Sequence, residues 1–347
     1  MTTPSGQSTE NAGKTVASVT NGYGRSDTGL VRPGNEDYLI IDDSRQLYIV
    51  CDGMGGHQAG EVASVTAVET IARVFQRHEM EVLADPRLNI GQVLPPKAEL
   101  LVKAVRLASR AVFTRATADT ALSGMGTTVV AAVCEADTMA LAHVGDSRAY
   151  RLCPRKLEPL TRDHSWVEEL QSSQRMTAEE ANSVVGKNVI TRALGVRETV
   201  EVDLRIVKIA PGDLFILCSD GLCGFADDDE IFEVATKFRE DPRRMSEALV
   251  QMANDRGGAD NVTVVVIEVK EAKTSPLPGC DPQTFPAENA ELLTAEDEWL
   301  IRLAEEAAQE PPESAQSGNR SPSRRILLAI FFLVIVIAVV VFWLQSD

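Results

Sequence analysis

The sequence is short of basic residues, of paired cysteines and of an apolar segment near its start. Lysine and arginine together number 34 against 51 aspartates and glutamates, which leaves a formal net charge of −17. A nucleic-acid partner is therefore not expected, because binding a phosphate backbone needs clustered positive charge. A metal site uses only a handful of carboxylates, so most of the excess negative charge is expected on a solvated surface.

The cysteines exclude a disulfide framework. Six occur, no two form a C-x-x-C pair, and Cys51, Cys134 and Cys218 lie inside apolar runs. A free cysteine in such a run behaves as a small core residue. We therefore expect free thiols and a reducing compartment.

The two ends of the chain differ in apolar character. The first 20 residues contain no apolar segment typical of a secretory signal. Residues 326–344, in contrast, carry no charge and are apolar on every face, which favours a single transmembrane helix over a buried core helix. At about 1.5 Å per residue this run spans about 28 Å, close to the hydrocarbon thickness of a bilayer. Arg324 and Arg325 precede it, so the positive-inside rule predicts a single-pass cell-membrane protein with its bulk in the cytoplasm.

Composition divides the rest of the chain into three parts. Residues 1–14 are polar and are expected to be disordered. Residues 15–270 alternate strand-like and helical runs and are expected to form the globular domain of the chain. Residues 271–325 are rich in Pro, Glu, Ala and Ser, which predicts a linker. A short helix at 295–309 is expected within it, because Thr294 opens a capping-box pattern; whether that helix docks a partner stays open.

The pattern within 15–270 predicts antiparallel sheets. Strands rich in β-branched and aliphatic residues are expected at 129–134, 138–144, 149–152, 202–209, 214–218 and 262–269. Helices are expected at 60–79, 98–118, 228–237 and 242–256. Because short turns join consecutive strands, antiparallel pairing is favoured over a doubly wound parallel sheet.

Four short acidic stretches stand where strand-like runs are expected to end. They are Asn35-Glu36-Asp37, Asp52-Gly53-Met54-Gly55-Gly56-His57, Ser219-Asp220-Gly221 and Asp260-Asn261. Carboxylates that converge from distant strand ends repel one another unless divalent cations lie between them. Oxygen-only ligands suit Mg²⁺ or Mn²⁺ rather than Zn²⁺. The pattern therefore predicts a two-metal hydrolase in which metal-bound water attacks an ester.

Eight motifs in order resemble the metal-dependent protein phosphatases of type 2C in their bacterial form. Besides the four acidic stretches, the first of which extends back to Gly29-Leu30-Val31-Arg32, they include Gly124-Met125-Gly126-Thr127-Thr128, Val144-Gly145-Asp146-Ser147-Arg148, Leu160-Thr161-Arg162-Asp163-His164-Ser165 and Ile190-Thr191-Arg192-Ala193-Leu194-Gly195. One Asp-Gly pair alone is commonest as a turn, but eight motifs in family order are specific. The resemblance covers about three quarters of the chain.

The resemblance implies an α+β fold and an activity. The fold is a four-layer αββα sandwich of two antiparallel sheets flanked by helices, to which the C-terminal transmembrane helix is added. The activity is hydrolysis of phosphoserine and phosphothreonine in proteins, without a phosphoenzyme, with two Mn²⁺ or Mg²⁺ ions and room for a third.

The resemblance also assigns roles to individual residues. Asp52 would bridge the two ions, and Asp220 and Asp260 would bind the first. Glu36 would bind the second, directly or through water, and the Gly53 carbonyl would bind one of the two. Asp146 would bind the third ion, with a structural turn as its alternative. Arg32 would bind the substrate phosphate with its guanidinium fork, and Asp37 would orient bound water, with a structural salt bridge as its alternative.

Several positions leave the resemblance incomplete. Animal relatives carry a histidine directly after the Asp-Gly pair, where this chain has Met54; His57 follows three residues later, so the general acid is unassigned. Thr127 and Thr128 are expected to support the site through hydrogen bonds. Residues 165–188 match the family's variable flap.

Two other interpretations remain beside the phosphatase. An inactive phosphatase-fold protein would bind phosphoproteins without hydrolysing them, and a hydrolase of small phosphoesters would share the metal chemistry. For the favoured interpretation the expected partners are phosphorylated proteins, including a membrane Ser/Thr kinase and its substrates, and the lipid bilayer.

Overall fold

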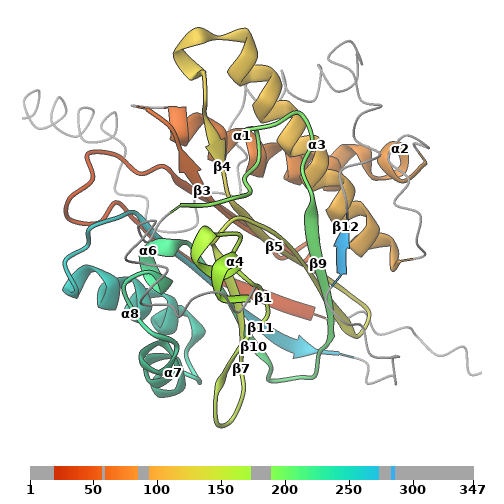
Figure 1. The fold of residues 1–347 in the computed structure, drawn as a ribbon. Coiled ribbons are helices and arrows are strands. Elements are labelled where there is room, and N and C mark those ends of the chain that lie inside the picture. Colours follow the sequence, from red (N-terminus) through yellow and green to blue (C-terminus); the bar gives the residue numbers. More distant parts are fainter. Residues whose placement is uncertain (1–18, 57–58, 85–93, 173–188, 273–282, 286–347) are drawn as a thin grey trace, which may run out of the picture. The chain divides into compact units, whose positions relative to one another are not determined.

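The computed structural model describes residues 19–56, 59–84, 94–172, 189–272 and 283–285 (Figure 1). The expected disordered segment 1–14, the helix at 295–309 and the membrane span at 326–344 all lie outside these residues, as does most of the linker. Among the helices that are described, none is both long and apolar enough to cross a membrane.

Two antiparallel sheets form the centre of the described part. The first has the strand order β1 (Val19–Asp27), β11 (Val262–Glu271), β10 (Leu214–Cys218), β7 (Arg148–Leu152), β8 (Leu157–Pro159). The second has the order β12 (Gln283–Phe285), β9 (Val202–Lys208), β6 (Thr138–Val144), β5 (Val129–Glu135), β3 (Leu47–Met54), β2 (Asp37–Asp42), with β4 (Gly126–Thr127) paired to β3. The predicted antiparallel pairing is confirmed.

The sheets pack face to face through aliphatic side chains. Val50 and Ala132 of the second sheet share one fully buried cluster with Leu217 and Val265 of the first. Alternation of side chains along a strand sends the intervening residues to the opposite face. On that outer face of the first sheet, Val264 packs in a separate cluster with the helices.

Helices cover both outer faces, as the four-layer sandwich requires (Figure 1). Helices α7 (Asp228–Lys237) and α8 (Pro242–Asp255) bury Ile231 and Leu249 against the five-stranded sheet. On the other side, α1 (Ala59–Arg73) lies on β3, and α3 (Pro96–Ala118) lies on β5 and β6. Helices α1 and α3 also pack on each other.

The helix expected at 60–79 is interrupted. It divides into α1, a π-helical turn at Val74–His78 and α2 (Glu79–Ala84). No proline or glycine marks this change in the sequence. The other helices and strands expected between residues 98 and 269 agree with the structure to within two residues at their ends.

Strand β1 was not predicted, because its sequence is unlike a strand. It contains Gly22 and Gly24 in its interior. Glycine weakens a strand, and it often marks a position where another part of the protein approaches the backbone closely. At Gly22 a Cβ atom would lie 2.6 Å from the ring of Tyr48. The glycine is therefore needed for packing of the two sheets, which no local pattern reveals.

Candidate active site

Asp52 lies within a strand rather than after one. In the sequence a strand-like apolar run at residues 47–51 leads into Asp52, but β3 continues to Met54 because β4 pairs with Gly53 and Met54. Asp52 consequently stands opposite Asp37 of the neighbouring strand β2. Two of the predicted site carboxylates are thus set side by side by strand register.

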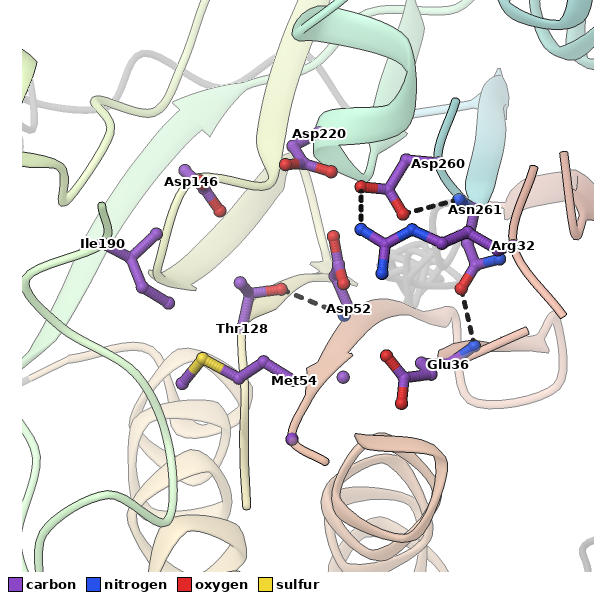
Figure 2. Close-up of a pocket in the computed structure, with 12 residues that line it drawn as sticks. Arg32, Glu36, Asp52, Met54, Thr128, Asp146, Ile190, Asp220, Asp260 and Asn261 are labelled. Carbon is purple, nitrogen blue, oxygen red and sulfur yellow. Dashed lines mark hydrogen bonds and ion pairs between the residues drawn. The ribbon is translucent and has the colours of Figure 1, made fainter. Parts of the chain in front are cut away.

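One pocket brings the predicted ligands together (Figure 2). It has a volume of about 240 Å³. Its lining includes the whole set of proposed metal ligands and the proposed phosphate-binding arginine, namely Arg32, Glu36, Asp52, Gly53, Asp146, Asp220 and Asp260. Residues up to 228 positions apart in the chain meet here, as the hydrogen bond between Arg32 and Asp260 illustrates.

The backbone of Asp52 is fixed by the two threonines expected to support the site. The Asp52 N–H donates to the Thr128 hydroxyl at 3.0 Å, and the Thr127 hydroxyl donates to the Asp52 carbonyl at 2.8 Å. Burial raises the pKa of Asp52 well above its usual range, and the negative charges of Asp37, Asp220 and Asp146 raise it further. A cation in the pocket would relieve this repulsion.

The position of Asp220 depends on a close backbone contact at the next residue, Gly221. It begins the short helix α6 (Asp220–Cys223), and a Cβ atom at Gly221 would lie 1.9 Å from the Asn261 carbonyl oxygen. The absence of a side chain lets the Asp220 and Asp260 segments touch. The Oδ1 atom of Asp220 is buried without a hydrogen-bond partner.

Glu36 and Gly53 meet at the start of α1. A Cβ atom on Gly60 would lie 2.7 Å from Oε1 of Glu36 and 2.9 Å from the Gly53 carbonyl oxygen. The two predicted ligand oxygens therefore flank one point. Burial raises the pKa of Glu36, and the nearby positive charge of Arg32 opposes that rise.

Asp37 does not line the pocket but lies directly behind it. Its side chain is buried, with Oδ2 accepting a 2.8 Å hydrogen bond from the Ser219 hydroxyl. The other oxygen, Oδ1, has no partner. Burial raises the pKa of Asp37 to about 7.

Arg32 forms an ion pair with a predicted metal ligand. Its Nη2 atom donates to Oδ2 of Asp260 at 2.8 Å, while Oδ1 of Asp260 accepts from the Asn261 N–H at 2.8 Å. Figure 2 shows the guanidinium reaching across one side of the pocket toward Asp260. The positive charge of Arg32 thus stands where a cation would otherwise neutralise Asp260.

The loop that carries Asp146 is held by a histidine. The backbone N–H of Gly145 donates to Nδ1 of His164 at 3.0 Å. The other ring nitrogen, Nε2, lies 3.1 Å from Nη1 of Arg192 and 3.2 Å from Oδ2 of Asp203. Burial, together with the negative charges of Asp220 and Asp163, raises the pKa of Asp146 to about 7.

The donor set fits hard divalent cations. The pocket offers carboxylate and carbonyl oxygens, two nearby buried carboxylate oxygens lack partners, and the carboxylates destabilise one another's ionised forms. Within the described ranges, however, no three acidic, histidine or cysteine side chains are close enough to enclose an ion as they stand. Binding of an ion by these residues would therefore require the carboxylates to move closer together.

Some expected features lie beyond the described residues. His57 is one of them, and so is most of the flap, of which only Ser165 and α4 (Trp166–Ser172) are described. Met54, at the position of the animal histidine, lines the pocket with a thioether that cannot donate a proton.

Three supporting residues were missed from the sequence. Asn261 accepts from the Glu36 N–H at 2.8 Å and donates to the carbonyls of Thr28 and Gly34. Ser219 joins Asp37 to the Thr263 N–H, and Gly60 makes room for Glu36. Asn261 and Ser219 are next to the predicted ligands Asp260 and Asp220 in the sequence, and this adjacency was the signal that could have identified them.

Comparisons with known proteins agree with this geometry. Residues 23–258 match the family model described as protein phosphatase 2C. The chain is 35% identical over 247 residues to the serine/threonine phosphatase stp of Listeria monocytogenes, covering 70% of this chain and 94% of that protein. It is 36% identical over 259 residues to the serine/threonine protein phosphatase PstP of Mycobacterium tuberculosis, covering 73% and 46%.

Solved structures give the same result. The crystal structure of the M. tuberculosis phosphatase PstP/Ppp has a TM-score of 0.63 at 35% identity, over 73% of this chain and 100% of that one. The catalytic domain of PstP in complex with two manganese ions has a TM-score of 0.61 at 33% identity, again over 73% and 100%. The chain therefore belongs to the protein phosphatase 2C family. Its enzymatic class is that of a protein serine/threonine phosphatase.

Proposed function

We propose that this phosphatase uses two Mn²⁺ or Mg²⁺ ions, with a third at Asp146, and works at the cytoplasmic face of the cell membrane. The observation that carries the metal proposal is the single pocket shared by Glu36, Asp52, Asp220 and Asp260. The related PstP domain holds two manganese ions.

Each ion would have its own set of ligands. Asp220 and Asp260 would hold the first, Glu36 and the Gly53 carbonyl the second, with Asp52 between them. The common point beside Gly60 supports pairing Glu36 with Gly53. The mutual repulsion of Asp52, Asp146 and Asp220 supports the placement of positive charge among them.

The chain's own residues would bind the substrate phosphate and orient the attacking water. When bound, the ions would lower the pKa of a coordinated water and neutralise phosphoryl oxygens. Arg32, once released from Asp260, would grip two phosphate oxygens with its planar fork. Asp37 would orient water near Asp52 through its free Oδ1. No described residue is assigned as the general acid.

The two remaining interpretations make different predictions. An inactive phosphoprotein-binding relative would have no need for the complete acidic set that lines the pocket. A hydrolase of small phosphoesters would not distinguish a phosphopeptide from a simple aryl phosphate. Hydrolysis of a phosphopeptide compared with that of an aryl phosphate, each measured with Mn²⁺ and again with chelator, separates all three.

The test of the metal proposal uses activity and binding together. EDTA should abolish phosphothreonine-peptide hydrolysis, and Mn²⁺ should restore it. Asp52→Asn should lower the rate by at least ~100-fold, because it removes the charge that both ions share. Asp229→Asn, at an exposed acid on α7 that does not line this pocket, is the matched control. Full activity in EDTA, or unaltered Mn²⁺ binding to Asp52→Asn by calorimetry, would reject the proposal.

The membrane proposal extends to the substrate. A phosphatase held at the membrane meets membrane-bound substrates at high effective concentration. We therefore propose that a transmembrane Ser/Thr kinase of the same cell is a substrate. Its phosphorylation should rise in a strain that lacks this phosphatase, and an unaltered level would count against the proposal.

A further inference from the structure

Two neighbouring aliphatic side chains project into solvent next to the catalytic pocket. Leu30 is 70% exposed and Val31 is 68% exposed. Single exposed apolar residues are ordinary on protein surfaces. Here, however, the pair stands directly before Arg32, which lines the pocket. We call Leu30 and Val31 the aliphatic rim.

The backbone beneath this rim is fixed. The N–H groups of Leu30 and Val31 both donate to the Gly258 carbonyl, at 2.7 Å and 3.2 Å. The preceding Gly29 has φ +76°, and a Cβ atom there would lie 2.3 Å from the Asp260 carbonyl oxygen. The turn is therefore locked onto the segment that carries Asp260, and it holds both side chains outward.

The position of the rim relative to the phosphate site defines what can reach it. A phosphate gripped by the Arg32 guanidinium lies one arginine side chain away from the Val31 backbone. An extended peptide advances by about 3.3–3.6 Å per residue. A residue two or three positions from the phosphoresidue lies roughly 7–10 Å from it, which matches this reach.

The chemistry of the rim selects an apolar group. The pocket itself is lined by carboxylates and one arginine on this side, with Ile190 on the side opposite Arg32 (Figure 2). Burying two aliphatic side chains against another aliphatic group removes apolar surface from water, whereas a charged or amide side chain would lose hydration there. The rim is also continuous with the pocket through Arg32.

From this geometry we propose that the aliphatic rim of Leu30 and Val31 is a specificity surface, which binds an aliphatic side chain two or three residues from the phosphoresidue of the protein substrate. The inference rests on the phosphoprotein activity and adds to it a preference for the sequence around the phosphoresidue.

The experiment compares matched phosphothreonine peptides. They carry Leu or Asn two and three positions from the phosphothreonine, on one side and then on the other, and are otherwise identical. We expect the wild-type chain to prefer the Leu peptide on one side by roughly tenfold in kcat/KM, the scale of one small apolar contact in a specificity site. In Leu30→Ser/Val31→Ser the ratio should fall to about one. Because the result is the ratio of kcat/KM for the Leu peptide to kcat/KM for the Asn peptide, a loss of activity that affects both peptides equally does not change it.

Two further variants keep the result interpretable. Met80→Ser removes a side chain that is 78% exposed on α2 and lines no part of the pocket, so it should keep the wild-type ratio. Val31→Thr keeps the branched shape and should reduce the ratio only in part, while thermal melting checks that each variant is folded.

The outcomes separate this inference from the activity it rests on. Equal hydrolysis of Leu and Asn peptides by the wild type, or an undiminished ratio in the double serine variant, would overturn the rim proposal and leave the phosphatase intact. A dimer lost only in the double variant, with an unchanged ratio, would assign the rim to a second copy of the chain. Absence of all phosphopeptide hydrolysis, with aryl phosphate still cleaved, would remove the protein substrate and the rim proposal with it.

Discussion

Arg32 is bound to Asp260, although our assignments give the arginine to phosphate and the aspartate to metal. The 2.8 Å contact between them satisfies both charges without any ligand. Surface ion pairs contribute little stability, because water solvates both partners well. Arg32 remains 47% exposed, so the pair can open at small cost when a cation and a phosphate replace the two partners.

This arrangement predicts the behaviour of Arg32 variants. Arg32→Ala should raise KM for a phosphothreonine peptide roughly tenfold with a smaller effect on kcat, because a charge-assisted contact to the phosphate is lost. Arg32→Lys should bring KM only part of the way back to the wild-type value, since lysine lacks the two-pronged guanidinium that binds two phosphate oxygens. Calorimetry should show that Mn²⁺ binding is retained or tighter in Arg32→Ala, as its competitor at Asp260 is gone. An unchanged KM would give Arg32 a structural role.

His164 supports the Asp146 loop through one side-chain hydrogen bond, beside a backbone bond from its N–H to the Gly145 carbonyl, and substitutions at His164 can isolate the side-chain bond. Asn can place an acceptor near the Nδ1 position that receives the Gly145 N–H, whereas Gln places its polar group nearer Nε2. His164→Gln should therefore lose about 1–3 kcal/mol of unfolding free energy, the cost of an unsatisfied buried donor, and His164→Asn less. Denaturant titrations measure this difference.

The same pair of variants should differ in their metal response. The Mn²⁺ concentration needed for half-maximal activity should rise more for His164→Gln than for His164→Asn, because Gly145 orients Asp146. Equal shifts in both variants would show that the ring as a whole, rather than its acceptor nitrogen, supports the loop.

At the scale of elements, helix α6 and the loop before β11 form one unit. Gly221 touches the Asn261 carbonyl, and each residue follows a proposed metal ligand. A side chain at position 221 would meet backbone atoms, which cannot rotate away. The spacing between the Asp220 and Asp260 segments is therefore set by the absence of a Cβ atom.

Gly221→Ala tests this coupling. We expect a loss of about 1–3 kcal/mol in unfolding free energy from overpacking, together with weaker Mn²⁺ binding because α6 must move away from Asn261. Gly34→Ala is the control, since a Cβ atom there would meet nothing within 4 Å and the Gly34 carbonyl is kept. Wild-type stability and metal affinity in Gly221→Ala would contradict the close approach.

For the whole molecule, chemistry and membrane attachment are predicted to be separable. All proposed ligands lie between Glu36 and Asp260, whereas the expected span is at 326–344. Deletion of residues 324–347 should move the protein to the soluble fraction and leave peptide hydrolysis nearly unchanged. A reporter after Asp347 should appear outside the cell and one at Met1 inside. A full-length chain that is soluble without detergent would refute the anchor and leave the phosphatase in place.

The sequence by itself determined the chemical class predicted for the site and the antiparallel pairing of the strands, and the sandwich followed from the family resemblance. Oxygen donors in Asn35-Glu36-Asp37, Ser219-Asp220-Gly221 and the other motifs indicate a hard-cation hydrolase, because ligand chemistry belongs to residue type. Strands such as β6 and β10 were predicted to the residue, since their aliphatic side chains are buried within the sandwich.

Only the tertiary structure decided the contacts among these residues. The extension of β3 past Asp52 depends on pairing with β4, and the packing of β1 depends on the Tyr48 ring over Gly22. The Arg32–Asp260 pair and the outward aliphatic rim depend on a turn locked to Gly258. Each joins segments distant in the chain, and a local pattern carries no information about such distances. Side-chain types fix which interactions are available, while the packing of the two sheets fixes which of them form.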